Sequence, residues 1–191
     1  MGYGTIMASI QSAEDVEAVM PVAMMVAKNH GAHVIGLHVM SGPPSLVHTP
    51  YDINLLVEAE ERMREAARTH AGELRGSFDA LVRGEADAVG EWRAVETPMT
   101  SIESDLIDHA RCSDLVMIAQ PDSQDNANRL GTVGEAILQT GRPVLVVPYA
   151  WSARSIGKRA FIAWNGSRES TRAVFDALPF LREAEEVRLY V

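Results

Sequence analysis

The sequence SDLVMIAQPDSQDNANRLGTVGEAILQTGRPVLVVP, residues 113–148, decides the fold. It contains two apolar runs, 115–119 and 144–147, of the kind typical of strands that are buried on both faces of a sheet. A polar loop over 120–130 and a short helix separate them. A strand, a crossover helix and a parallel strand form a right-handed unit, and ligands bind in the crevice beyond the carboxyl ends of its strands. This loop is therefore the first place to look for a ligand site.

The helix of this unit is expected to begin at Gly131. Thr132 and Glu135 have the spacing of a capping box, in which each side chain bonds the backbone amide of the other residue. Gly141 and Pro143 then end the helix. The sequence thus predicts that the backbone amides of Gly131 and Thr132 lie at a helix amino-terminus.

The rest of the first 148 residues alternates between strand and helix patterns. The segment 89–95 has a low apolar content, which indicates a strand at the edge of a sheet. Five strands and four helices are typical of a doubly wound α/β domain with a parallel sheet. The three remaining strands are expected at 5–10, 33–39 and 89–95, and the three remaining helices at 14–31, 54–80 and 100–113.

The end of the chain resembles its beginning. We expect a domain over 1–148, a linker over 149–158, and a partial second repeat, β-α-β, over 159–191, in which Asn165-Gly166-Ser167 matches Gln11-Ser12-Ala13. A single β-α-β unit cannot bury both faces of its strands, and its edges stay unpaired. Two interpretations stay open: a truncated tandem protein, or a partial repeat that completes its sheet against the first domain or another chain.

Composition narrows the function classes. A net charge of −9 without a basic cluster argues against a nucleic-acid partner. The apolar run 18–27 follows acidic residues and is too short to span a bilayer, so neither a signal peptide nor a membrane helix is expected. Cys112 is the only cysteine, which excludes an intrachain disulfide and favours a reducing, cytoplasmic location.

Four segments together resemble the bacterial tandem universal stress proteins, here with an incomplete second repeat. They are the strand-to-turn opening before Glu14, residues 31–34, residues 131–138 with 143–148, and residues 163–169. The resemblance implies the five-stranded parallel core shared with adenine-nucleotide hydrolases. It also implies a homodimer or pseudo-dimer through strand 143–148, and binding of ATP or AMP as cofactor.

The nucleotide pattern that the resemblance brings, G-x2-G-x9-G-[ST], is only partly present. Gly131 and Thr132 match its end, whereas Ala119 and Asp122 stand where the first two glycines would fall, and the segment is one residue short. Glycine matters because only a backbone without Cβ atoms bends closely around a phosphate. Asp122 and Asp125 also place carboxylates where phosphates would approach.

The acidic residue that the family has at the end of its first strand would be Gln11 here, and Asn165 in the second repeat. The resemblance therefore gives a candidate nucleotide site, expected to be degenerate, lined by Gln11, Ser12, Val39, Ala119, Gly131, Thr132 and Val133.

Three functional hypotheses follow. The first is a non-enzymatic stress-response protein that acts by dimerisation or partner binding, with no catalytic residues and no metal. The second is an ATP- or AMP-binding regulator or slow ATPase, in which the irregular loop still closes over phosphates. The third is a purely structural assembly module built on strand 143–148. Binding of labelled ATP separates the first two, and the oligomeric state after a charge is placed at Val146 tests the third.

Overall fold

The computed structural model describes residues 2–42, 53–85, 87–97, 102–121, 127–148 and 155–191. Its centre is a five-stranded sheet in the order β3-β2-β1-β4-β5, and all neighbouring strands are parallel. The predicted fold class is confirmed, and so is the position of the weakly apolar third strand at the sheet edge. The strands are β1 (Thr5–Ser9), β2 (His33–Ser41), β3 (Val89–Thr97), β4 (Leu115–Ala119) and β5 (Val144–Val147).

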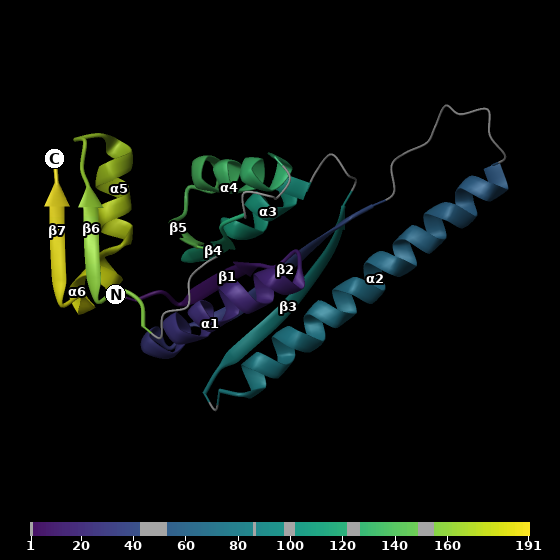
Figure 1. Cartoon of the computed structure of the whole chain (residues 1–191), viewed down its shortest axis with the longest axis horizontal. Coiled ribbons are helices and arrows are strands. Elements are labelled where there is room, and N and C mark those ends of the chain that lie inside the picture. Colours follow the sequence, from purple (N-terminus) through teal and green to yellow (C-terminus); the bar gives the residue numbers. More distant parts are fainter. Residues whose placement is uncertain (1, 43–52, 86, 98–101, 122–126, 149–154) are drawn as a thin grey trace.

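Helices cover both faces of this sheet, as in a doubly wound domain (Figure 1). α1 (Ala13–His30) and α2 (Ile53–Arg83) pack on one face, and α3 (Ile102–Ala110) and α4 (Ala127–Gln139) on the other. Among the described helices, none is long and apolar enough to cross a bilayer. α1 contains Pro21 and ends at Gly31, whose left-handed φ of 64° suits a residue without a Cβ atom.

The two faces of the sheet bury separate hydrophobic clusters, because successive strand residues point to opposite faces. In β1, Ile6 and Ala8 belong to the cluster under α1 and α2, whereas Met7 belongs to the cluster under α3 and α4. Gly36 in β2 leaves room for α2: a Cβ atom there would lie 2.7 Å from the ring of Phe78. The sheet is thus the middle of three layers.

One predicted boundary is wrong and bears on the site. α4 begins at Ala127, so Gly131 and Thr132 lie in its second turn and not at its amino-terminus. The segment 127–130 contains alanine, arginine and leucine, which are good helix formers, and it joins the helix ahead of the glycine. The predicted capping box of Thr132 and Glu135 therefore does not start the helix.

The carboxyl-terminal segment forms a second, smaller unit. Its strands β6 (Arg159–Ala163) and β7 (Glu186–Tyr190) pair in parallel, with α5 (Arg168–Asp176) and α6 (Leu178–Glu183) between them in the chain. Within the described residues these strands form a separate two-stranded sheet, so the interpretation that the repeat completes its sheet against the first domain is wrong. Completion against another chain stays a prediction. Figure 1 shows the unit beside the first domain, close to the amino-terminus.

Candidate functional site

The turn from β1 into α1 lies at the carboxyl end of the sheet, beside the point where the strand order reverses between β1 and β4. Ser12 caps α1, and its hydroxyl accepts a bond from the Asp15 amide at 3.3 Å. In return, the Asp15 carboxylate accepts the amides of Gln11 at 2.8 Å and Ser12 at 3.1 Å. Asp15 is only 3% exposed, so a buried carboxylate already holds the amides that open this helix.

The side chain of Gln11 closes the same turn from the other side. Its Oε1 atom accepts the backbone amide of Val39, near the end of β2, at 3.3 Å. The amide of Ile10 donates to the Leu37 carbonyl at 2.9 Å and carries the β1–β2 pairing into the turn. The Val39 amide, at the strand end where a ligand would approach, is therefore satisfied within the chain.

Two histidines bond the carbonyls of this turn. His38 Nδ1 lies 2.8 Å from the Ile10 carbonyl oxygen, and His70 Nε2 lies 3.4 Å from that of Gln11. The pKa of His38 is lowered, chiefly because its ring is buried; the bond to Ile10 raises it, His70 lowers it further and Asp15 raises it. A low pKa keeps this imidazole neutral at neutral pH.

Ala119 ends β4, on the other side of β1 from β2. Its side chain is 7% exposed and packs in the cluster under α1 and α2. The next amide, of Gln120, donates to the Val147 carbonyl at 2.7 Å, so the chain leaves β4 bound to β5. Asp122 and Asp125, the carboxylates expected near phosphates, lie outside the described residues.

The three α4 residues of the predicted site contribute differently. Val133 is half-buried and packs against the cluster that contains Val39. Gly131 is exposed and Thr132 half-buried. In an α-helix each amide donates to the carbonyl four residues earlier, so those of Gly131 and Thr132 are directed into the turn that begins at Ala127. They do not form the open helix terminus that the sequence predicted.

The structure thus brings Gln11, Ser12 and Val39 together, with Ala119 on the neighbouring strand. Sequence reasoning missed the buried Asp15 and the two histidines. Ser12-x-x-Asp15 has capping-box spacing and could have been found, because an aspartate at the third position can reach back to the turn. His70 reaches the turn from α2, 59 residues away in sequence, and no local signal predicts this.

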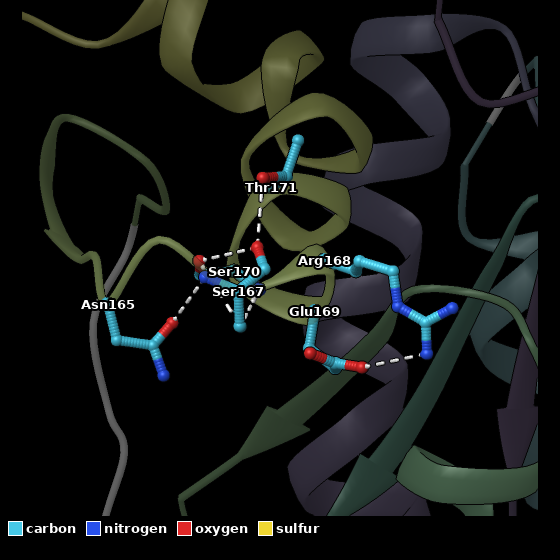
Figure 2. A network of polar contacts seen from close by, with 6 residues as sticks. All are labelled: Asn165, Ser167, Arg168, Glu169, Ser170 and Thr171. Atoms are coloured by element: carbon cyan, nitrogen blue, oxygen red, sulfur yellow. Dashed lines mark hydrogen bonds and ion pairs between the residues drawn. The ribbon is translucent and has the colours of Figure 1, made fainter.

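The turn from β6 into α5 in the second unit corresponds to the turn from β1 into α1, and its polar contacts are shown in Figure 2. The amide of Trp164 donates to the Tyr190 carbonyl at 2.8 Å, as that of Ile10 does to Leu37, so Asn165 is in register with Gln11. Asn165 Oδ1 accepts the Ser167 amide at 3.1 Å. Ser167 caps α5 and so corresponds to Ser12, not to Ala13 as the sequence suggested, because Gly166 is an additional residue.

The cap of α5 has no buried carboxylate. The Ser167 hydroxyl accepts the amide of Ser170 at 3.1 Å, and Ser170 stands where α1 has Asp15. The Glu169 side chain is exposed; bonds from its own amide and from Ser167 lower its pKa. Arg168 lies 3.8 Å from that carboxylate (Figure 2). Both turns therefore have a serine cap, but only the β1–α1 turn has a buried carboxylate that accepts the backbone amides of the turn.

Comparison with solved structures relates this fold to known proteins; no protein-family model and no curated protein matches the sequence. The universal stress protein UspA from Lactobacillus plantarum has a TM-score of 0.62 at 18% identity, over 77% of this chain and 99% of that protein. A universal stress protein from Archaeoglobus fulgidus, solved in complex with dAMP, has a TM-score of 0.53 at 18% identity, over 77% and 99%. A longer one, from Archaeoglobus fulgidus DSM 4304, has a TM-score of 0.63 at 14% identity, over 97% of this chain and 64% of its own.

Proposed function

We propose that this chain, which has the fold of the universal stress proteins, belongs to that family and acts by assembly with other polypeptides without catalysing a reaction. Its first domain holds ATP or AMP weakly or not at all. The solved proteins with this fold support the assignment, and the closed β1–α1 turn supports the weak binding. We place the protein in the cytoplasm, divided into a domain over 1–148, a linker over 149–158 and a second-repeat unit over 159–191.

The observation that carries this proposal is the closure of the turn by the chain's own groups. A ligand that needs the Val39 amide must displace the Gln11 side chain. An anion that needs the amides of Gln11 and Ser12 must compete with the carboxylate of Asp15. Breaking a hydrogen bond to a charged group costs about 1.5–3 kcal/mol, which is one to two orders of magnitude in affinity.

The segment where the phosphates of a nucleotide would bind also supports weak binding. A phosphate group binds where several free amides converge at a helix terminus or a glycine-rich turn. The amides of Gly131 and Thr132 are directed along the interior of α4. Residues with Cβ atoms also stand at Ala119 and Asp122. The part of the family pattern that this chain retains therefore does not itself supply a phosphate cradle.

Calorimetric titration of the whole chain with ATP and with AMP tests the proposal. We expect no saturable heat up to millimolar nucleotide, whereas the Archaeoglobus fulgidus protein solved with dAMP is the positive control. Gln11→Ala frees the Val39 amide, so this variant should bind adenine nucleotide more tightly than the parent. Gln139→Ala changes an exposed glutamine on α4 and is the matched control. Saturable micromolar binding by the unaltered chain would refute the proposal.

The second candidate is a nucleotide-binding regulator or slow ATPase. The dAMP complex of a protein with the same fold favours it. On this alternative, the Gln11 side chain contributes to the ligand contact, and Gln11→Ala weakens binding. Release of inorganic phosphate from ATP, measured in parallel, separates a slow ATPase from a regulator that only binds.

We propose that assembly uses β5 as the edge of the sheet. Within the described residues β5 pairs with β4 on one side only, which leaves a row of backbone donors and acceptors for another chain. On the adjoining helix α4, Ile137 is 52% and Leu138 81% exposed. An open strand beside exposed apolar side chains suits pairing with β5 of a second copy.

The oligomeric state of a charged variant tests this interface. Val146→Glu places a charge on β5 and should convert a dimer into a monomer in light scattering. Val187→Glu places the same charge on β7, the edge of the smaller sheet, and should leave the dimer intact. Circular dichroism confirms that each variant is folded. A folded Val146→Glu protein that remains dimeric would exclude β5 as the interface.

A further inference from the structure

The β1–α1 turn is held by two imidazoles from two different elements. His38 comes from β2 and bonds the Ile10 carbonyl, and His70 comes from α2 and bonds the carbonyl of the next residue, Gln11. The two rings contact edge to face with centroids 5.8 Å apart. Two imidazoles thus bond consecutive carbonyls of one turn. The same turn holds the Gln11 side chain that accepts the Val39 amide.

The hydrogen bonds identify where an added proton would go. A carbonyl oxygen only accepts, so the ring nitrogen facing it must carry hydrogen. The hydrogen that His38 directs to the Ile10 carbonyl therefore lies on Nδ1, and an added proton goes to its Nε2. The hydrogen that His70 directs to the Gln11 carbonyl lies on Nε2. The neutral His38 ring already makes its bond, and the added proton gives this ring a charge without adding a bond to the turn.

The surroundings of His38 disfavour that charge. His38 is 5% exposed, and Trp92 on β3 stacks on its ring with centroids 6.2 Å apart. His70 contacts it from α2 and lowers its pKa, whereas the charge of Asp15 on α1 raises that pKa. The Asp15 carboxylate is already shared between two amides. Arg62, Glu65 and Glu73 on α2 line the same shallow pocket as His70.

We propose that His38 and His70 form a proton-responsive clamp that holds the β1–α1 turn closed at neutral pH and releases Gln11 and Val39 on acidification. An imidazolium at His38 is most stable when its ring reaches water. Because the ring is bonded to the turn at Ile10, we expect exposure of the ring to open the turn. The released Val39 amide can then donate to a ligand. Only this last consequence rests on the proposed function, since the clamp itself involves no nucleotide.

The direction of the pH dependence follows from the lowered pKa of His38. The closed turn binds the second proton less tightly than an opened turn, in which histidine titrates near its ordinary value of about 6.5. The stability of the closed turn is therefore complete above about pH 6.5 and falls as the pH drops below it. One proton limits the loss to about tenfold in the opening equilibrium per pH unit, and attraction of the cation to the Trp92 ring reduces it.

Hydrogen exchange of single amides, measured by NMR on the whole chain, tests the clamp. The Val39 amide reports on the turn, and that of Val34, in the buried middle of the sheet, reports on global unfolding. Between pH 7.5 and 5.5 we expect the protection factor of Val39 to fall by about threefold to tenfold more than that of Val34. His38→Asn keeps an N–H donor near the position of Nδ1 but does not titrate, and it should abolish this additional loss.

Two controls complete the experiment. His70→Gln keeps a donor near the position of Nε2 but removes the imidazole that lowers the pKa of His38, so it should reduce the additional loss. His33→Asn removes a half-exposed histidine at the other end of β2, 3.9 Å from Glu91, and should leave the pH dependence unchanged. Equal losses at Val39 and Val34, or an additional loss that persists in His38→Asn, would overturn the proposal.

A second readout covers the case in which His38→Asn does not fold. In the unaltered chain, the ring resonances of His38 and the amide resonances of Gln11 and Val39 should titrate with one common midpoint. Different midpoints would overturn the clamp. Failure of the clamp is distinct from failure of the proposed function, because nucleotide binding at neutral pH contradicts only the latter.

Discussion

The chain contains the same strand-turn-helix-strand motif twice, in β1-α1-β2 and in β6-α5-α6-β7, and the two copies differ in burial. Both turns start with the amide after the first strand donating to the second strand, and both helices are capped by a serine, Ser12 or Ser167. β1 is almost entirely buried, whereas every residue of β7 is exposed. The local pattern is therefore enough to form the motif but not to bury it.

Neighbouring elements account for this difference. β1 lies between β2 and β4, and α1 and α2 cover one of its faces. Among the described residues, β6 and β7 pair only with each other. By strand register, Met7 in β1 corresponds to Phe161 in β6; Met7 is 1% exposed and Phe161 is 67% exposed. The contribution of an apolar side chain to stability depends on the burial its neighbours provide.

The largest expected effect comes from truncating this matched pair. Met7→Ala leaves a cavity between the sheet and α3, and should lower the free energy of unfolding by about 2–5 kcal/mol. Phe161→Ala removes a larger side chain from an exposed position and should change it by less than about 0.5 kcal/mol. Urea denaturation followed by circular dichroism measures both. A comparable loss in Phe161→Ala would mean that β6 is buried by contacts with another chain.

Sequence reasoning predicted the elements of both units, but it left open which strands pair with the second unit. The runs 115–119 and 144–147 are apolar throughout because their strands are buried on both faces, so they could be identified without the structure. The β-α-β repeat expected over 159–191 contains the observed strands β6 (Arg159–Ala163) and β7 (Glu186–Tyr190). That a single β-α-β unit cannot bury both faces of its strands could be predicted. Which strands pair with it could not, since pairing depends on elements outside the unit.

The candidate site shows the same limit. The capping box of Ser12 and Asp15 is a local signal and could be predicted. The Gln11–Val39 bond spans 28 residues and depends on the alignment of β1 with β2. α4 starts ahead of the predicted boundary at Gly131, because a single glycine inside a helix costs only about 1 kcal/mol. Four helix-compatible residues before it were enough to extend the helix.

The next largest change in the free energy of unfolding is expected at the third helical residue of each turn, Asp15 in α1 and Ser170 in α5. Asp15→Ala leaves the amides of Gln11 and Ser12 without their acceptor at a site that is 3% exposed, and should cost about 1–3 kcal/mol. Ser170→Ala, at the corresponding position of α5, leaves the bond from its own amide to Ser167 intact and should cost less than about 0.5 kcal/mol. Thermal unfolding monitored by fluorescence compares the two. Equal costs would mean that the α1 turn gains nothing from its buried carboxylate.

Substitutions of the two capping serines are expected to differ less in their effect on the free energy of unfolding. Ser12→Ala removes the acceptor for the Asp15 amide and should cost about 1 kcal/mol of global stability. Ser167→Ala removes the same kind of bond, but its effect should appear as local fraying of α5, because no residue of that helix is buried. Amide exchange at Ser170 measures the fraying of α5, and urea denaturation measures the global free energy of unfolding. A global loss in Ser167→Ala as large as in Ser12→Ala would show that the two units unfold together.

Tyr3 links the two units. The hydroxyl of Tyr3 donates to the Asp176 carbonyl at 2.8 Å, and its ring lies 5.3 Å from those of His30 and Phe180. Tyr3→Phe keeps the ring packing and removes one hydrogen bond, so it should cost about 0.5–1.5 kcal/mol. Burial and the nearby Asp176 raise the pKa of Tyr3, so the phenol stays a donor and the cost should be equal at pH 6 and pH 9.

Where this cost appears shows how the second unit is stabilised. If β6 and β7 depend on the Tyr3 contact, exchange of the Trp164 amide should accelerate in Tyr3→Phe while that of the Ile10 amide does not change. His109→Ala, on α3, is a control for non-specific loosening. Equal acceleration at Trp164 and Ile10 would mean that the contact contributes to the whole fold. No acceleration at either amide would mean that the smaller unit is held by its own hydrogen bonds, and the difference in burial between the two copies would then have no consequence for their stability.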